Sequence, residues 1–157
     1  MSVGDIDLEA LRDAACRTLC VVGVIGVAII HIADTGDAYA AAHYLFWLYI
    51  VLVVLAVPLV TALVNTRSPL VWVATAAFAA APLAGYLISR SIGLPGDTDD
   101  LGNWMNSLGI ASLFVESGLI ALSVTRLWQL GHAEARPASL RTGPRHTITQ
   151  PQTQGVS

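Results

Sequence analysis

Four long apolar stretches run through the chain, and they limit its possible folds more than any other feature. They cover residues 14–33, 40–64, 69–92 and 107–127. Each is close to the ~20 residues that cross ~30 Å of hydrocarbon as a helix, and a backbone in lipid has to satisfy its own hydrogen bonds. The stretches therefore predict an all-α integral membrane protein, with a four-helix transmembrane bundle of up-down topology over residues 14–131.

The composition agrees with lipid as the main solvent of this chain. Of its 157 residues, 55% are hydrophobic and 12% are charged, whereas soluble domains carry about 25% charged residues. The net charge is −3, and no cluster of basic side chains offers the positive surface that nucleic acid requires. The lipid bilayer is thus the predicted partner, and nucleic acid is excluded.

The placement of arginines predicts the orientation in the membrane. Arginines lie before or near the start of the first stretch, between the second and the third, and at or after the end of the fourth, while Arg90 alone lies near a remaining connection. The positive-inside rule then places both termini in the cytoplasm of a multi-pass plasma-membrane protein. Residues 1–13 form a cytoplasmic N-terminal segment, whose acidic residues argue against a cleaved signal peptide. Residues 132–157, rich in Pro, Thr, Gln and Ser, are predicted to be a disordered cytoplasmic tail.

Glu116 is the most informative single residue. It lies about nine residues into the fourth stretch, near mid-membrane, where an ionisable side chain costs ~2.5–3.5 kcal/mol and usually marks a functional site or a buried pair. Ser112 precedes it by one helical turn on the same face. Glu116 is therefore either a ligand, proton or cation site, or a neutral side chain that hydrogen-bonds a neighbouring helix.

A histidine and an aspartate lie together where the first stretch ends. His31 and Asp34 are three residues apart, so both can contact one ligand or share a proton; His31 is equally compatible with a solvated cap residue. A metal ion is a possible cofactor, with His31 and Glu116 as its candidate ligands. Cys16 and Cys20 have no neighbouring histidine, so a structural zinc site is not predicted.

The connection between the third and fourth stretches is predicted to be an ordered lid. Pro95 and Gly96 suit the central positions of a type II turn, and three aspartates follow without matching the EF-hand pattern. Arg90 opposes the positive-inside bias, so we expect Asp97, Asp99, Asp100 or Glu116 to pair with it. The candidate lid residues are Gly93, Pro95, Gly96, Asp97, Asp99, Asp100, Asn103 and Trp104.

Three consecutive segments carry a resemblance to a known family. They read GYLISRSIGLPG at 85–96, DDLGNW at 99–104 and LGIASLFVE at 108–116. This pattern resembles the GYxLSRxxGLPG…DDxGNWxxxLGxxSLxxE signature of small uncharacterised four-span membrane proteins of actinobacteria, which also tend to end the first span in a pair similar to Ile30–His31. The resemblance implies a four-span fold and a lineage, and it assigns no activity.

The leading functional interpretation is a binding or accessory protein without enzymatic activity. An outward-facing polar pocket would be lined by His31, Asp34, Arg90, Ser112 and Glu116. It would bind a small ligand or a metal ion, or the protein would serve as an accessory subunit of a larger membrane complex. One alternative is an oligomeric transporter or channel component, a homo-oligomer in which Glu116 is the proton or cation site. A second alternative is a redox or haem-associated membrane protein, which would need axial ligands such as histidine.

Overall fold

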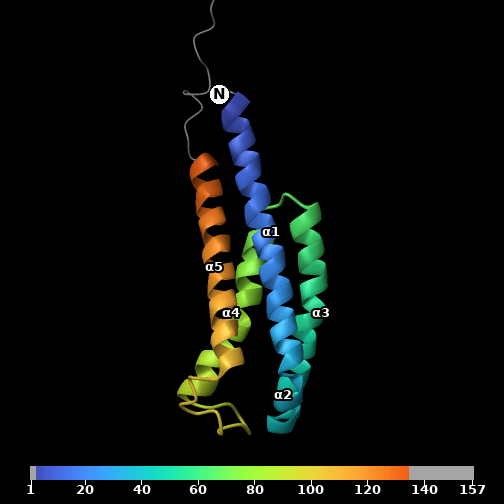
Figure 1. Ribbon diagram of the computed structural model, residues 1–157, viewed down its shortest axis with the longest axis vertical. Coiled ribbons are helices and arrows are strands. Elements are labelled where there is room, and N and C mark those ends of the chain that lie inside the picture. The colour runs from blue at the N-terminus through green and yellow to red at the C-terminus, as the bar shows by residue number, and fades with distance from the viewer. Residues whose placement is uncertain (1–2, 135–157) are drawn as a thin grey trace, which may run out of the picture.

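The protein folds into five helices, of which four are long and pack as a bundle (Figure 1). The computed structural model describes residues 3–134. The helices are α1 (Val3–Ala33), α2 (Thr35–Ala41), α3 (His43–Asn65), α4 (Leu70–Ser91) and α5 (Ser107–Glu134). The all-α prediction is confirmed, and successive long helices run in opposite directions.

The observed helix boundaries differ from the predicted ones at two places. Helix α1 begins at Val3, so it includes residues of the predicted N-terminal segment. The second apolar stretch was predicted to start at residue 40, but Ala42 has an extended backbone (φ −158°, ψ 130°) and separates the short helix α2 from α3. Residues 132–134 of the predicted tail continue α5, and the rest of that tail lies outside the described residues.

The four long helices are apolar enough to cross a membrane. The spans are Leu8–Ala33, His43–Asn65, Leu70–Ser91 and Ser107–His132, with mean hydropathies of 1.7 to 2.7. Large apolar side chains such as Val22, Val57 and Phe114 are exposed on their surfaces, which suits lipid rather than water. The chain is therefore a multi-pass membrane protein.

The two ends of the bundle are packed differently. We call the end with the first turns of α1, the last turns of α5 and the 66–69 connection the terminal end, and the end with α2 and the 92–106 segment the loop end (Figure 1). Buried residues of α3 are Ala56, Leu59 and Leu63, all in its half toward the terminal end. In α4, residues 71–79 include five buried side chains, and 80–88 include none. Helices α3 and α4 are thus packed tightly at the terminal end and separate from each other toward the loop end.

Polar side chains hold the terminal end together. The Arg17 guanidinium donates hydrogen bonds to Asp13 Oδ2 (2.8 Å) and to the Leu63 carbonyl oxygen (2.9 Å). Arg126 pairs with the same Asp13 carboxylate. Both guanidinium groups contact the ring of the buried Trp72, at 5.3 and 5.7 Å from its centroid. Helices α1, α3, α4 and α5 are therefore joined at one cluster, where the arginine charges are paired.

Helix α5 packs against a tyrosine ring of α4 at a glycine near its start. A Cβ atom at Gly109 would collide with the ring of Tyr86, and that ring is anchored by a hydrogen bond from its hydroxyl to the Trp104 carbonyl oxygen (3.1 Å). Small residues in this role let helix backbones approach in membranes. The α4–α5 pair accordingly has the most extensive contact in the bundle.

We expect Gly109→Ala to lower the free energy of unfolding by about 1–3 kcal/mol, because the added methyl group overpacks the α4–α5 contact. Thermal unfolding followed by circular dichroism in detergent measures this. The matched control is Gly118→Ala, since no atom lies within 4 Å of a Cβ there. Equal melting temperatures for the two variants would contradict the prediction.

Candidate functional site

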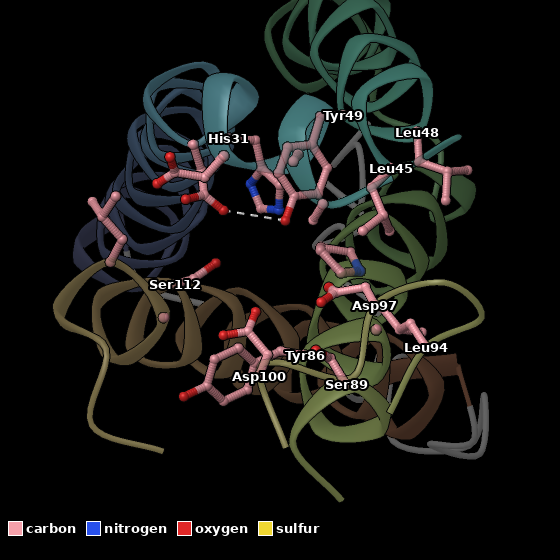
Figure 2. Close-up of a pocket in the computed structure, with 18 of the residues that line it drawn as sticks. His31, Leu45, Leu48, Tyr49, Tyr86, Ser89, Leu94, Asp97, Asp100 and Ser112 are labelled. Atoms are coloured by element: carbon pink, nitrogen blue, oxygen red, sulfur yellow. Dashed lines mark hydrogen bonds between the residues drawn. The ribbon is translucent and has the colours of Figure 1, made fainter. Parts of the chain in front are cut away.

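A cavity of about 750 Å³ opens at the loop end. Its walls come from the end of α1, from α2, from the first half of α3, from the last turns of α4, from the first turns of α5 and from the 92–106 segment. Figure 2 shows His31 and Tyr49 on one side of this cavity, across from Ser112 and Asp100. The cavity exists because α3 and α4 separate there.

The cavity brings together most of the residues that the sequence singles out. His31, Asp34, Arg90 and Ser112 line it. Of the predicted lid, Asp97, Asp99 and Asp100 line it, whereas Gly93, Pro95, Gly96, Asn103 and Trp104 are not among the lining residues. Glu116 also lies outside the lining.

Glu116 lies directly beneath Ser112. Its side chain is 0% exposed, and its Oε1 accepts a hydrogen bond of 2.5 Å from the Ser112 hydroxyl. No described residue hydrogen-bonds the other carboxylate oxygen, Oε2, which is also buried. Glu116 is therefore linked to the cavity only through Ser112, and its Oε2 has no hydrogen-bond partner among the described residues.

A histidine, a tyrosine and an aspartate form one side of the cavity. His31 Nδ1 lies 2.9 Å from the Val27 carbonyl oxygen, which only accepts, so Nδ1 carries the proton of this bond. The imidazole packs edge-on against Tyr49, with ring centroids 4.7 Å apart. The Tyr49 hydroxyl donates to Asp34 Oδ2 at 3.3 Å. Sequence reasoning missed Tyr49, because it looks like one more aromatic residue of an apolar span.

Arg90 ties the 92–106 segment to α4. It pairs with Asp100, one of the four predicted partners, and it donates to Ser89 Oγ at 3.1 Å. Its guanidinium also lies 4.9 Å from the centroid of the Tyr86 ring. The Gly102 amide donates to the Arg90 carbonyl oxygen at 3.0 Å. The segment is thus held over the cavity by both side-chain and backbone bonds.

The turn within this segment has the predicted glycine geometry. Leu94 and Asp97 exchange backbone hydrogen bonds of 2.9 Å across Pro95 and Gly96, and Gly96 has φ +80°. A type II turn requires a positive φ at its third residue, which favours glycine. The turn directs Asp97, which is 8% exposed, toward the cavity.

Carboxylates outnumber cations around the cavity. Five aspartates line it (Asp34, Asp37, Asp97, Asp99 and Asp100), against the single arginine Arg90, which Asp100 already pairs. Among the side chains of residues 8–132, no group of three or more His, Cys, Asp and Glu is placed to hold a metal ion. The carboxylates are spread around the cavity instead of converging on one point.

Comparisons of the chain with protein-family models, with curated proteins and with solved structures find no match. The resemblance to four-span actinobacterial proteins therefore stays a prediction.

We expect Asp100→Asn to loosen the 92–106 segment, because it removes the ionic partner of Arg90. Asp100 is about a third exposed, so the pair contributes about 1 kcal/mol, and amide exchange in residues 93–103 should rise about fivefold. Hydrogen exchange with mass spectrometry measures the change. Asp99→Asn is the matched control. Equal rates of amide exchange in the two variants would contradict the prediction.

We expect Glu116→Leu to leave stability unchanged or to raise it by about 1–2 kcal/mol, because an apolar side chain of similar volume replaces a buried carboxyl group with an unpartnered oxygen. The released Ser112 hydroxyl can bond the carbonyl of the preceding turn. Thermal unfolding tests this, with Ser117→Leu on the exposed face of α5 as the control. A large loss of stability in Glu116→Leu alone would show that the carboxyl group holds the bundle together.

Proposed function

We propose that this membrane protein is a non-enzymatic binding protein whose loop-end cavity takes a small organic cation. The observation that carries the proposal is the excess of carboxylates in the lining, five aspartates against one paired arginine. Charge–charge attraction is several times stronger beside a partly buried carboxylate than in bulk water. A ligand with a positive charge therefore gains binding free energy in this cavity, whereas an anionic ligand would be repelled.

Aromatic rings add a second attraction for a cation. Tyr44, Tyr49 and Tyr86 all line the cavity. The face of an aromatic ring attracts an ammonium or guanidinium group, by about 0.5–2 kcal/mol depending on desolvation. Arg90 already uses the Tyr86 ring in this way, and His31 packs against the Tyr49 ring. Tyr44 is therefore the lining tyrosine whose ring is most available to a ligand.

The distribution of the protein's donor atoms around the cavity favours an organic cation over a bare metal ion. A metal ion needs several donors converging at about 2–2.6 Å. The predicted metal pair consists of His31, which lines the cavity, and Glu116, which lies below Ser112 and outside the lining. Dispersed carboxylates and tyrosines suit a larger cation, whose charge is spread over several atoms.

The arginine pattern supports a cavity that faces the outside of the cell. If both termini are cytoplasmic, the loop end and its aspartates lie on the extracellular side of the membrane. Participation in a larger membrane complex and association with haem stay predictions from the sequence.

One observation favours a second candidate function, cation or proton transport by an oligomer. Glu116 is fully buried, and within the described residues its Oε2 has no partner, as expected of a group that exchanges a proton or an ion within a membrane. A single four-helix chain is small for a transport path, so this function requires self-association. A monomer in nanodiscs, measured by mass photometry or sedimentation, would count against it.

Binding of benzyltrimethylammonium to the purified protein tests the cation proposal. We expect binding that weakens with added salt, and no binding of benzenesulfonate, an anion with a similar apolar group. Asp34→Asn and Asp37→Asn should each weaken binding about fivefold, equivalent to ~1 kcal/mol per lost ion pair. Isothermal titration calorimetry in detergent measures both.

The control for these variants is Glu9→Gln, which removes one negative charge from α1 far from the cavity. It should bind as the unaltered protein does. The proposal is wrong if benzenesulfonate binds as well as the cation, or if the two aspartate variants match Glu9→Gln.

A further inference from the structure

We infer that the ligand is a cationic amphiphile of the bilayer, which enters sideways between α3 and α4 and keeps its apolar chain in that gap. This inference rests on the proposed function, because the carboxylates select the charged end. It adds the class of ligand and the route of entry, which the charge pattern alone does not provide.

The first observation is that the cavity continues into an apolar groove. Leu45, Leu48, Leu52 and Leu55 of α3 line it on one side, and Ala81 and Pro82 of α4 line it on the other. The four leucines recur at three- and four-residue spacing, so they share one face of α3 over about 15 Å, half the thickness of the hydrocarbon core. A small polar ligand would contact little of an apolar wall of this length, whereas an apolar chain would contact all of it.

The second observation is that the groove is open to the surroundings of the bundle. Leu48 is 57% exposed and Leu55 is 52% exposed, although both line the cavity. No residue of α3 from His43 to Leu55 is buried. Contact between α3 and α4 is limited in comparison with the α4–α5 pair. The gap between α3 and α4 therefore gives a molecule dissolved in the bilayer direct access to the carboxylates.

The polar and apolar walls are arranged as an amphiphile requires. Asp34, Asp97 and Asp100 lie at the loop end, where the helices end and headgroups begin. The leucine face of α3 runs from there toward the middle of the span. A charged headgroup among the aspartates thus places its chain along the groove without burying a charge in hydrocarbon.

Gly85 keeps the groove wide on the α4 side. It lines the cavity, and no atom lies within 4 Å of a Cβ built there. A larger side chain at this position can fill the groove without displacing its neighbours. The position therefore allows the chain site to be blocked while the aspartates stay intact.

The test is photolabelling with a dodecyltrimethylammonium probe that carries a diazirine near the end of its chain. The protein is reconstituted in nanodiscs of phosphocholine lipid, irradiated and mapped by mass spectrometry. We expect labels on residues 48–55 of α3 and on residues 81–85 of α4. A probe with the same chain and diazirine but a sulfate headgroup should label these segments several-fold less.

Gly85→Leu should lower the labelling of both segments about fivefold, because its side chain occupies the groove. Gly118→Leu is the matched control: it makes the same substitution in a span, with the same gain in helix propensity, at a glycine that has open space and does not line the cavity. This variant should be labelled to the same extent as the unaltered protein.

The outcomes separate this inference from the proposed function. If α3 and α4 are not labelled, or if Gly85→Leu and Gly118→Leu label equally, sideways entry is wrong even though aspartate-dependent binding of benzyltrimethylammonium stands. If the sulfate probe labels as strongly as the cationic probe, the groove accepts any chain and the cationic class is wrong. If neither the probe nor benzyltrimethylammonium binds, both proposals fail.

Discussion

Lipid offers no hydrogen bonds, and this constraint shapes the rest of the structure. Each polar side chain within a span has to bond another part of the protein or face a hydrated cavity. Arg17 and Arg126 share the Asp13 carboxylate and the ring of Trp72. Arg90 bonds Asp100 and Ser89. The requirement is met only in part, because Arg90 Nε, Arg126 Nε and Glu116 Oε2 are buried without a hydrogen-bond partner among the described residues.

The same constraint explains why the two ends of the bundle differ. At the terminal end, paired charges and a buried Trp72 draw four helices into contact. At the loop end, α3 has no buried residue before Ala56, and α4 has none between Ala79 and Ser89. Tight packing at one end fixes the helices, and their separation at the other leaves a cavity with a defined shape. Rigidity and an open site are thus supplied by opposite ends of the same four helices.

The cavity joins a polar surface and an apolar one. Aspartates surround its polar part, and the leucine face of α3 continues it toward mid-membrane. This arrangement matches a molecule with a charged end and an apolar end, which is also how lipids are built. Arg90 holds the 92–106 segment, which carries three of these aspartates, against α4.

The sequence by itself determined that the chain is all-α, that four of its helices are long and apolar enough to span a membrane, and that a turn with a glycine of positive φ follows α4. These features depend on local physics: the length of an apolar stretch, and the backbone freedom of Gly96. It also singled out His31, Asp34, Arg90 and Ser112, because polar residues at the ends of apolar stretches stand out. Only the tertiary structure decided that these four share one cavity, that Asp100 is the partner of Arg90, that Tyr49 joins His31 to Asp34, and that Glu116 lies beneath Ser112. Those relations depend on how far α3 and α4 separate, and no spacing along one helix encodes the distance to another.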